Sequence, residues 1–267
     1  MFELFELQFM QRALVAGVST GFALSIIGVF VVLRRSAFFG DAVAHFAFLG
    51  IALGFLISMN PIATAVGVSL LLAIGIGYIQ RRVSIQSLDT IIGIFFSGAA
   101  ALGIFTIGLL EGYRVDLFQF LFGDIISVSW TDAFFAVLIA FTVFIIFMIT
   151  WKPLFRITFN KEVAAVAGVR VEYYEYIFLA MLALVTAVSI KIIGIILVPA
   201  LLVIPAAAAK NVSQSFKQMI VFSIIFGVLS VLIGLIGSFY FNTASGATIV
   251  LTAILFFFIT ALIQVRK

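Results

Sequence analysis

The chain has 267 residues, of which 65% are hydrophobic and only 10% charged, and its mean hydropathy is +1.35. Soluble domains are about 45–50% apolar and about 25% charged, so these values exclude a soluble protein and predict an all-α polytopic membrane protein. The absence of cysteine excludes disulfides, thiolate metal sites and cysteine nucleophiles. Basic loops on the cytoplasmic side of a membrane explain the net charge of +4 better than nucleic-acid binding does.

About nine stretches are apolar and long enough to be membrane-spanning helices, each of which needs about 20 residues. They cover residues 13–33, 40–58, 62–80, 91–110, 133–150, 176–190, 193–209, 218–240 and 247–264. The apolar run 177–209 is too long for one crossing, and Lys191 interrupts it, so we expect a tight hairpin of two short spans. Residues 1–267 are expected to form a single transmembrane domain.

Residues 118–130 are apolar but too short to cross a bilayer, and they contain Gly123 and Asp124. We expect a short re-entrant segment here, because irregular backbone at membrane depth is tolerated only inside protein or beside a cavity. Asp124 is a candidate to line a pathway through the membrane, and a simple turn-forming role stays open for it. Pro199 and Pro205 can break their helix and are further candidates for such a pathway.

The basic residues predict the orientation of the chain. If the loop after the first span is cytoplasmic, that side carries Arg34, Arg35, Arg81, Arg82, Lys152, Arg156, Lys161, Arg170, Lys210, Lys217, Arg266 and Lys267. The other side then carries only Arg12, Arg114 and Lys191. Because cytoplasmic loops are enriched in Lys and Arg, we expect the C-terminus inside and, with nine spans, the N-terminus outside.

The longest cytoplasmic loop is expected at about 151–174 and contains FNKEVAAVAGVR. Its alanines favour a short helix, and Gly168 lies where a C-terminal cap is expected. No stretch outside the membrane is large enough for a catalytic domain, and no phosphate-binding Gly-Lys-Ser/Thr loop is present. The chain is therefore not expected to be an enzyme, and it cannot hydrolyse ATP by itself.

Asp41 and His45, the only histidine, lie within the span expected at 40–58. Their spacing of four residues places both side chains on one face of a helix, about 5–6 Å apart at Cβ. An acid at membrane depth normally faces a partner or a cavity, and carboxylate plus imidazole suits Zn²⁺, Mn²⁺ or Fe²⁺. A packed histidine beside an aspartate at a helix start is the structural alternative.

Four stretches, in this order, carry a resemblance to a known family. They are RALVAGVSTGFALSIIGVFVVLRRSAFFGDAVAHFAFLGIALGF, FLFGDIISVSW, FNKEVAAVAGV and KIIGIILVPALLVIPAAAA. The sequence resembles the permease subunits of ABC importers for zinc, manganese and iron. It is also distantly similar to the larger cobalamin and siderophore importer permeases, which implies that fold.

The resemblance implies roles for two groups of residues. Asp41 and His45 correspond to the metal-coordinating pair of the translocation pathway, and the coupling helix that docks on the ATPase corresponds to Asn160, Lys161, Glu162, Ala165 and Gly168. It further implies a homodimer in the prokaryotic plasma (inner) membrane, two ATP-binding subunits and an extracytoplasmic metal-binding protein. The metal is cargo and no cofactor is permanently bound; zinc is expected first, then manganese or iron.

Ligand counting supports this interpretation independently, because one chain supplies two convincing ligands where a four-coordinate site needs four. A two-fold dimer would bring together two copies of Asp41 and of His45. An intramembrane aspartyl protease that uses Asp41 and Asp124 is an alternative. An ion-coupled secondary carrier is another, although the inverted repeats expected of one are not found.

Overall fold

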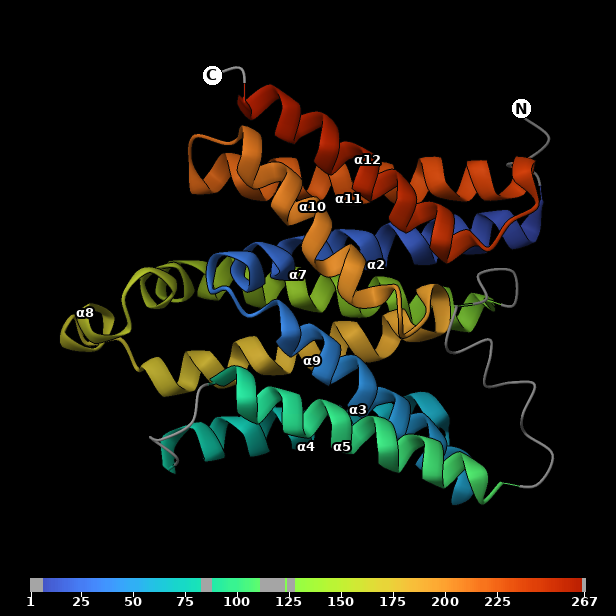
Figure 1. Ribbon diagram of the computed structural model, residues 1–267, viewed down its shortest axis with the longest axis horizontal. Helices are drawn as coiled ribbons and strands as arrows, with labels where there is room; N and C mark the ends of the chain where they lie inside the picture. Colours follow the sequence, from blue (N-terminus) through green and yellow to red (C-terminus); the bar gives the residue numbers. More distant parts are fainter. Residues whose placement is uncertain (1–6, 83–87, 111–122, 124–127, 266–267) are drawn as a thin grey trace.

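The computed structural model of the protein describes residues 7–82, 88–110, 123 and 128–265. The long helices lie side by side, and the chain reverses direction from one to the next (Figure 1). In these residues the helices are α2 (Gln8–Leu33), α3 (Ala37–Leu56), α4 (Pro61–Arg82), α5 (Leu88–Gly108), α7 (Trp130–Phe159), α8 (Lys161–Val166), α9 (Val171–Ile193), α10 (Val198–Val212), α11 (Phe216–Phe241) and α12 (Ser245–Val265).

The predicted all-α polytopic fold is confirmed. Each of the nine expected spans corresponds to one helix, and eight of these helices are long and apolar enough to cross a membrane. With 15 residues, α10 is shorter than the roughly 20 that a crossing needs. The start of α2 and the end of α12 lie at opposite ends of the bundle, as an odd number of crossings requires (Figure 1).

The hairpin predicted from the long apolar run is present as α9 and α10, but its break was assigned to the wrong residue. Lys191 lies in the last turn of α9, and the helix ends at Gly194, which has a φ of 96°. Such a φ favours glycine because it has no Cβ to clash with the backbone. The helix accommodates Lys191 because its ammonium group has an anionic partner, Asp132.

Helix α7 is longer than predicted. It continues through Pro153 to Phe159, so the connection to α9 spans residues 160–170 and is shorter than the predicted 151–174. A proline inside a helix removes one hydrogen bond, and tertiary packing compensates for the loss here. Phe155 lies with its ring centroid 4.7 Å from that of Phe159 and 4.7 Å from that of Phe216.

The centre of the bundle is formed by α2 and α9, in each of which 72% of the membrane-spanning window is buried. Glycines let neighbouring helices approach closely there. A Cβ on Gly28 of α2 would overlap the carbonyl oxygen of Leu202 in α10, and a Cβ on Gly40 of α3 would lie 2.7 Å from Leu202 Cδ2. Leu202 therefore packs against the backbones of both α2 and α3.

The predicted re-entrant segment is not confirmed, since residues 118–122 and 124–127, Asp124 among them, lie outside the described residues. Gly123 is described and has a φ of 75°. A Cβ on Gly123 would overlap the carbonyl of Ile193 and lie 2.7 Å from Gly194 N. Gly123 thus packs directly on the turn between α9 and α10.

Candidate functional site

Asp41 and His45 are placed as predicted, one turn apart on α3, and both side chains are half-buried. They line a cavity of about 450 Å³ between α3, α5 and the turn that joins α9 to α10. Its lining residues are Phe38, Asp41, His45, Ile92, Gly93, Phe96, Ser97, Ile195 and Ile196. The acid and the histidine therefore face a common space, which is what an ion-binding pair requires.

The orientation of the His45 ring follows from its hydrogen bond. Its Nδ1 lies 2.9 Å from the main-chain oxygen of Asp41. Because a carbonyl oxygen can only accept, this contact assigns a proton to Nδ1, and in the neutral ring the lone pair of Nε2 is then available to a ligand. Histidines that bind metals commonly donate their other ring N–H in this way. The Phe96 ring, 4.3 Å away between centroids, packs against the imidazole.

Helix α5 forms the opposite wall of the cavity. The ring pairs His45–Phe96 and Phe46–Phe95, at 4.3 and 5.9 Å between centroids, hold α3 and α5 side by side. Gly93 and Ser97 face the cavity one turn apart, as Asp41 and His45 do on α3. Among the described residues, no atom outside the adjoining stretch of α5 lies within 4 Å of where a Cβ on Gly93 would stand, so this glycine keeps part of the space open.

Sequence reasoning missed the α5 wall and the contribution of Ile195 and Ile196 from the turn. The matching i, i+4 spacing on α5 was the available signal. The other predicted pathway residues lie elsewhere: Pro199 in the first turn of α10 and Pro205 in its interior, both buried and neither among the residues that line this cavity. Within the described part of the chain, no group of three or more His, Cys, Asp or Glu side chains could hold a metal ion.

The predicted short helix of the cytoplasmic connection is present as α8. Asn160 caps its start, since the side-chain oxygen accepts a hydrogen bond from Val163 N at 3.0 Å. Gly168, with a φ of 80°, ends it as predicted, and Val169 N donates to Ala164 O at 3.0 Å. Such a left-handed residue after a helix is a frequent C-terminal cap.

Helix α8 projects beyond one end of the bundle (Figure 1). Its residues Lys161, Glu162 and Ala165 are exposed, and the apolar side chains of Val163 and Val166 are 64% and 91% exposed. Lys161 Nζ pairs with Glu175 of α9 at 2.5 Å, which ties the start of α8 to the bundle. Apolar side chains exposed in this way are typical of a surface that another protein covers.

A second cavity, of about 370 Å³, lies behind α8 and is lined by residues that include Arg34, Lys161 and Glu175. Arg34 donates from Nε to Thr158 Oγ1 at 3.0 Å, and its guanidinium lies 4.4 Å from the centre of the Phe178 ring. Burial lowers the pKa of Arg34 to about 10, and nearby Glu175 opposes this shift. Arg34, the C-terminal cap of α2, thus joins the end of α2 to α9 and to the end of α7 that leads into α8.

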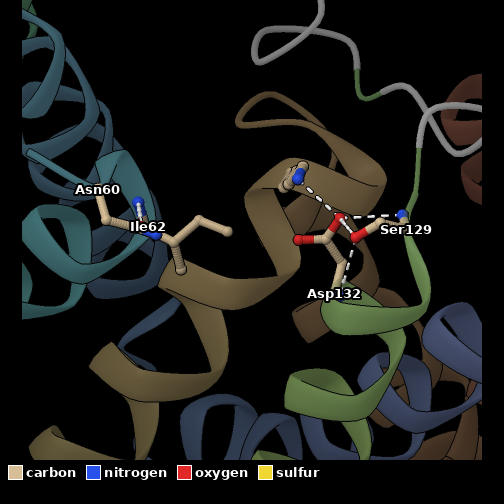
Figure 2. A network of polar contacts seen from close by, with 5 residues as sticks. Asn60, Ile62, Ser129 and Asp132 are labelled. Carbon is tan, nitrogen blue, oxygen red and sulfur yellow. Dashed lines mark hydrogen bonds and ion pairs between the residues drawn. The ribbon is translucent and has the colours of Figure 1, made fainter.

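A polar network that the sequence did not predict joins the start of α7 to the end of α9. Asp132 Oδ2 accepts from Ser129 N at 3.0 Å, from Ser129 Oγ at 2.6 Å and from Lys191 Nζ at 2.7 Å. Figure 2 shows Ser129 and Asp132 turned toward each other at the first turn of α7. The network fixes the end of α9 from which the cavity-lining turn departs.

A sequence model of the ABC 3 transport family matches residues 6–264. The chain belongs to this family. Among its ABC 3 relatives, the "high-affinity zinc uptake system membrane protein ZnuB" of Haemophilus influenzae is 35% identical over 95% of this chain and 96% of that protein. The "manganese transport system membrane protein MntC" of Listeria monocytogenes is 36% identical over 99% of this chain and 94% of that protein.

Two solved structures share the fold of this chain. The structure described as "PsaBC from Streptococcus pneumoniae in complex with Fab" matches with a TM-score of 0.88 and 34% identity over 97% of this chain and 93% of that chain. A putative metal-chelate type ABC transporter matches with a TM-score of 0.76 at 14% identity, which shows the fold alone. The resemblance to metal-ion ABC importer permeases is confirmed: the chain is a transport subunit and not an enzyme.

Proposed function

We propose that this chain is the membrane-spanning permease of an ATP-driven importer for a divalent transition-metal ion, zinc or manganese. The observation that carries the proposal is the cavity that Asp41 and His45 share, in which His45 Nε2 is available to an ion. Relatives named for zinc and for manganese both cover nearly the whole chain, which supports either cargo. The donor pair is compatible with either ion, because imidazole suits Zn²⁺ and carboxylate suits Mn²⁺.

The two donors argue for a second copy of the chain. Within the described residues one protomer offers a carboxylate and an imidazole, and a four-coordinate ion needs twice that number. A two-fold axis beside the cavity would supply the same pair again and complete the ion site. An ion held by movable ligands from two protomers can also be released, as transport requires.

The exposure of α8 suits this helix to docking on an ATP-binding subunit. Asn160 and Gly168 fix its two ends, and Lys161 anchors it through Glu175. Since no phosphate-binding loop is present in the chain, two such subunits would supply the energy. An extracytoplasmic metal-binding protein would deliver the ion at the opposite end of the bundle.

The proposed orientation follows from charge. The end of the bundle that carries α8 also carries the ends of α10 and α12 (Figure 1), and the last turn of α10 contains the exposed Lys210. The positive-inside rule makes this end cytoplasmic, and with it the C-terminus of a multi-pass protein of the prokaryotic inner membrane. The aspartyl-protease alternative has no comparable support, because it depends on Asp124, which lies outside the described residues.

The test is metal accumulation in cells that lack other zinc and manganese importers, with this chain expressed beside its ATPase and binding protein. Wild type is compared with His45→Ala and Asp41→Asn at equal membrane abundance, under chelation and with one metal restored at a time. We expect both variants to lose accumulation of the same metal, because each removes one ligand type from the ion path. Wild-type accumulation in both variants would refute the ion-binding role of the pair.

A further inference from the structure

We infer that Ser97 of α5 supplies a third ion ligand, its hydroxyl oxygen, and that this oxygen favours manganese over zinc. The inference rests on the proposed metal path through the cavity of Asp41 and His45. Among the described residues that line that cavity, Ser97 is the one besides the acid and the histidine whose side chain carries an oxygen, nitrogen or sulfur atom. The remaining lining positions are apolar or glycine.

The packing of α3 against α5 brings the helix face that carries Asp41 and His45 opposite the helix face that carries Ser97. The His45 and Phe96 rings are in contact at 4.3 Å between centroids, and Ser97 directly follows Phe96. Gly93, one turn before Ser97 on the same face, leaves part of the cavity between these two helix faces empty. A side chain at residue 93 would fill that space, so the glycine gives an ion access to both walls.

The Ser97 hydroxyl is also free to bind. Serine and threonine in membrane helices usually donate to the carbonyl oxygen three or four residues earlier, as Thr106 of the same helix does to Leu102 O at 2.7 Å. Within the described part of the chain, no hydrogen bond is formed by Ser97, and its side chain is exposed. An uncommitted hydroxyl beside a carboxylate and an imidazole is well placed to be a ligand.

The chemistry of the donors gives the direction of the preference. Oxygen donors suit Mn²⁺, whereas imidazole and above all thiolate suit Zn²⁺. With Ser97, each protomer offers two oxygens and one nitrogen, and without it one of each. Loss of the hydroxyl should therefore reduce manganese transport more than zinc transport, and replacement by a thiol should reverse the preference.

Transport by the complete importer tests the preference, with manganese and zinc uptake measured for wild type, Ser97→Ala and Ser97→Thr. We expect Ser97→Ala to lower the ratio of manganese to zinc uptake about tenfold, a loss typical of groups that tune a metal site. Ser97→Thr keeps the hydroxyl and should retain the ratio. An unchanged ratio in Ser97→Ala, or an equal loss in both variants, would overturn the inference.

A spectroscopic test uses the absence of cysteine in the chain. In the purified full-length Ser97→Cys protein, Cd²⁺ should produce thiolate-to-metal charge-transfer absorption, and Asp41→Asn in the same protein should weaken it. Thr106→Cys is the matched control, because Thr106 lies on α5 but not on the cavity and should give no such band. Absence of the band from Ser97→Cys would count against direct ligation.

These experiments separate two failures. If Asp41→Asn abolishes uptake while Ser97→Ala behaves as wild type, the proposed function stands and the role of Ser97 is refuted. If neither substitution affects uptake of either metal, the metal path itself is misplaced, and the inference about Ser97 falls with it.

Discussion

The close approach of α2 and α10 predicts that Gly28→Ala lowers the stability of the protein. Gly93→Ala, in the open space beside α5, is predicted not to lower it. A Cβ on Gly28 would overlap the Leu202 carbonyl oxygen and lie 3.0 Å from the Leu202 carbonyl carbon, so the two helices must separate. A Cβ on Gly93 meets nothing within 4 Å. Since a glycine inside a helix costs about 0.5–1 kcal/mol relative to alanine, Gly93→Ala should be neutral or stabilising.

The expected size of the Gly28→Ala effect follows from this overlap. An added methyl in a well-packed interior costs about 1–3 kcal/mol, and the overlap with a backbone carbonyl places Gly28→Ala at about 2–3 kcal/mol, of which the alanine returns about 1 kcal/mol as helix propensity. With the scaling of soluble domains, the net destabilisation of about 1–2 kcal/mol corresponds to an apparent melting temperature about 2–8 °C lower.

The measurement is the fraction of purified protein that remains monodisperse after heating in detergent, for wild type, Gly28→Ala and Gly93→Ala. The Gly93→Ala protein controls for the change of residue type on an equally apolar helix. A Gly28→Ala protein that melts at or above the wild-type temperature would refute the packing argument at this contact.

Three further substitutions test other features. Lys191→Met leaves Asp132, whose side chain is 11% exposed, without its cation, so we expect the protein to lose about 1–3 kcal/mol of stability. The added change Asp132→Asn should restore part of that stability. Thermal melting of the single and double variants measures both effects, and additive losses of stability would contradict the pairing. Gly168→Ala forces a Cβ onto a residue with a φ of 80° and should destabilise the end of α8 by about 1–2 kcal/mol. Amide hydrogen exchange in α8 should therefore become faster. Gly168→Asn is the control and should have a smaller effect, because asparagine tolerates this backbone conformation better. Val166→Asp alters the 91% exposed tip of α8 and should lower ATP-driven uptake while protein abundance and melting stay unchanged; undiminished uptake would show that this tip does not bind the ATPase.

The sequence predicted the helices well because each apolar run has one physical solution in a bilayer. It also predicted that Asp41 and His45 share a helix face, since that depends only on a spacing of four residues, and that Gly168 ends α8. It misplaced the break between α9 and α10 because the partner of Lys191 lies 59 residues away in the chain. Local reading treats such a cation as an interruption, when a distant carboxylate in fact stabilises it within the helix.

The wall of the cavity that α5 forms could not be predicted from the sequence, for a different reason. Gly93 and Ser97 are residue types that most often serve helix packing, and only the register between α3 and α5 places them opposite Asp41 and His45. That register depends on ring contacts between helices, so the i, i+4 spacing of Gly93 and Ser97 does not by itself show that this face of α5 lies opposite Asp41 and His45. Tertiary packing therefore determines which small residues of this chain line the cavity of Asp41 and His45.

The solvent exposure of α8 affects the chain during its synthesis and membrane insertion. Five of its six residues are exposed, and Ala164 alone is buried. A newly inserted chain that has not met a partner holds two valines in water at this tip, where proteases and aggregation act on uncovered apolar segments. If the proposed ATP-binding subunit covers α8, synthesis in step with that subunit would protect the chain, and overproduction of the chain alone should yield material clipped between α7 and α9.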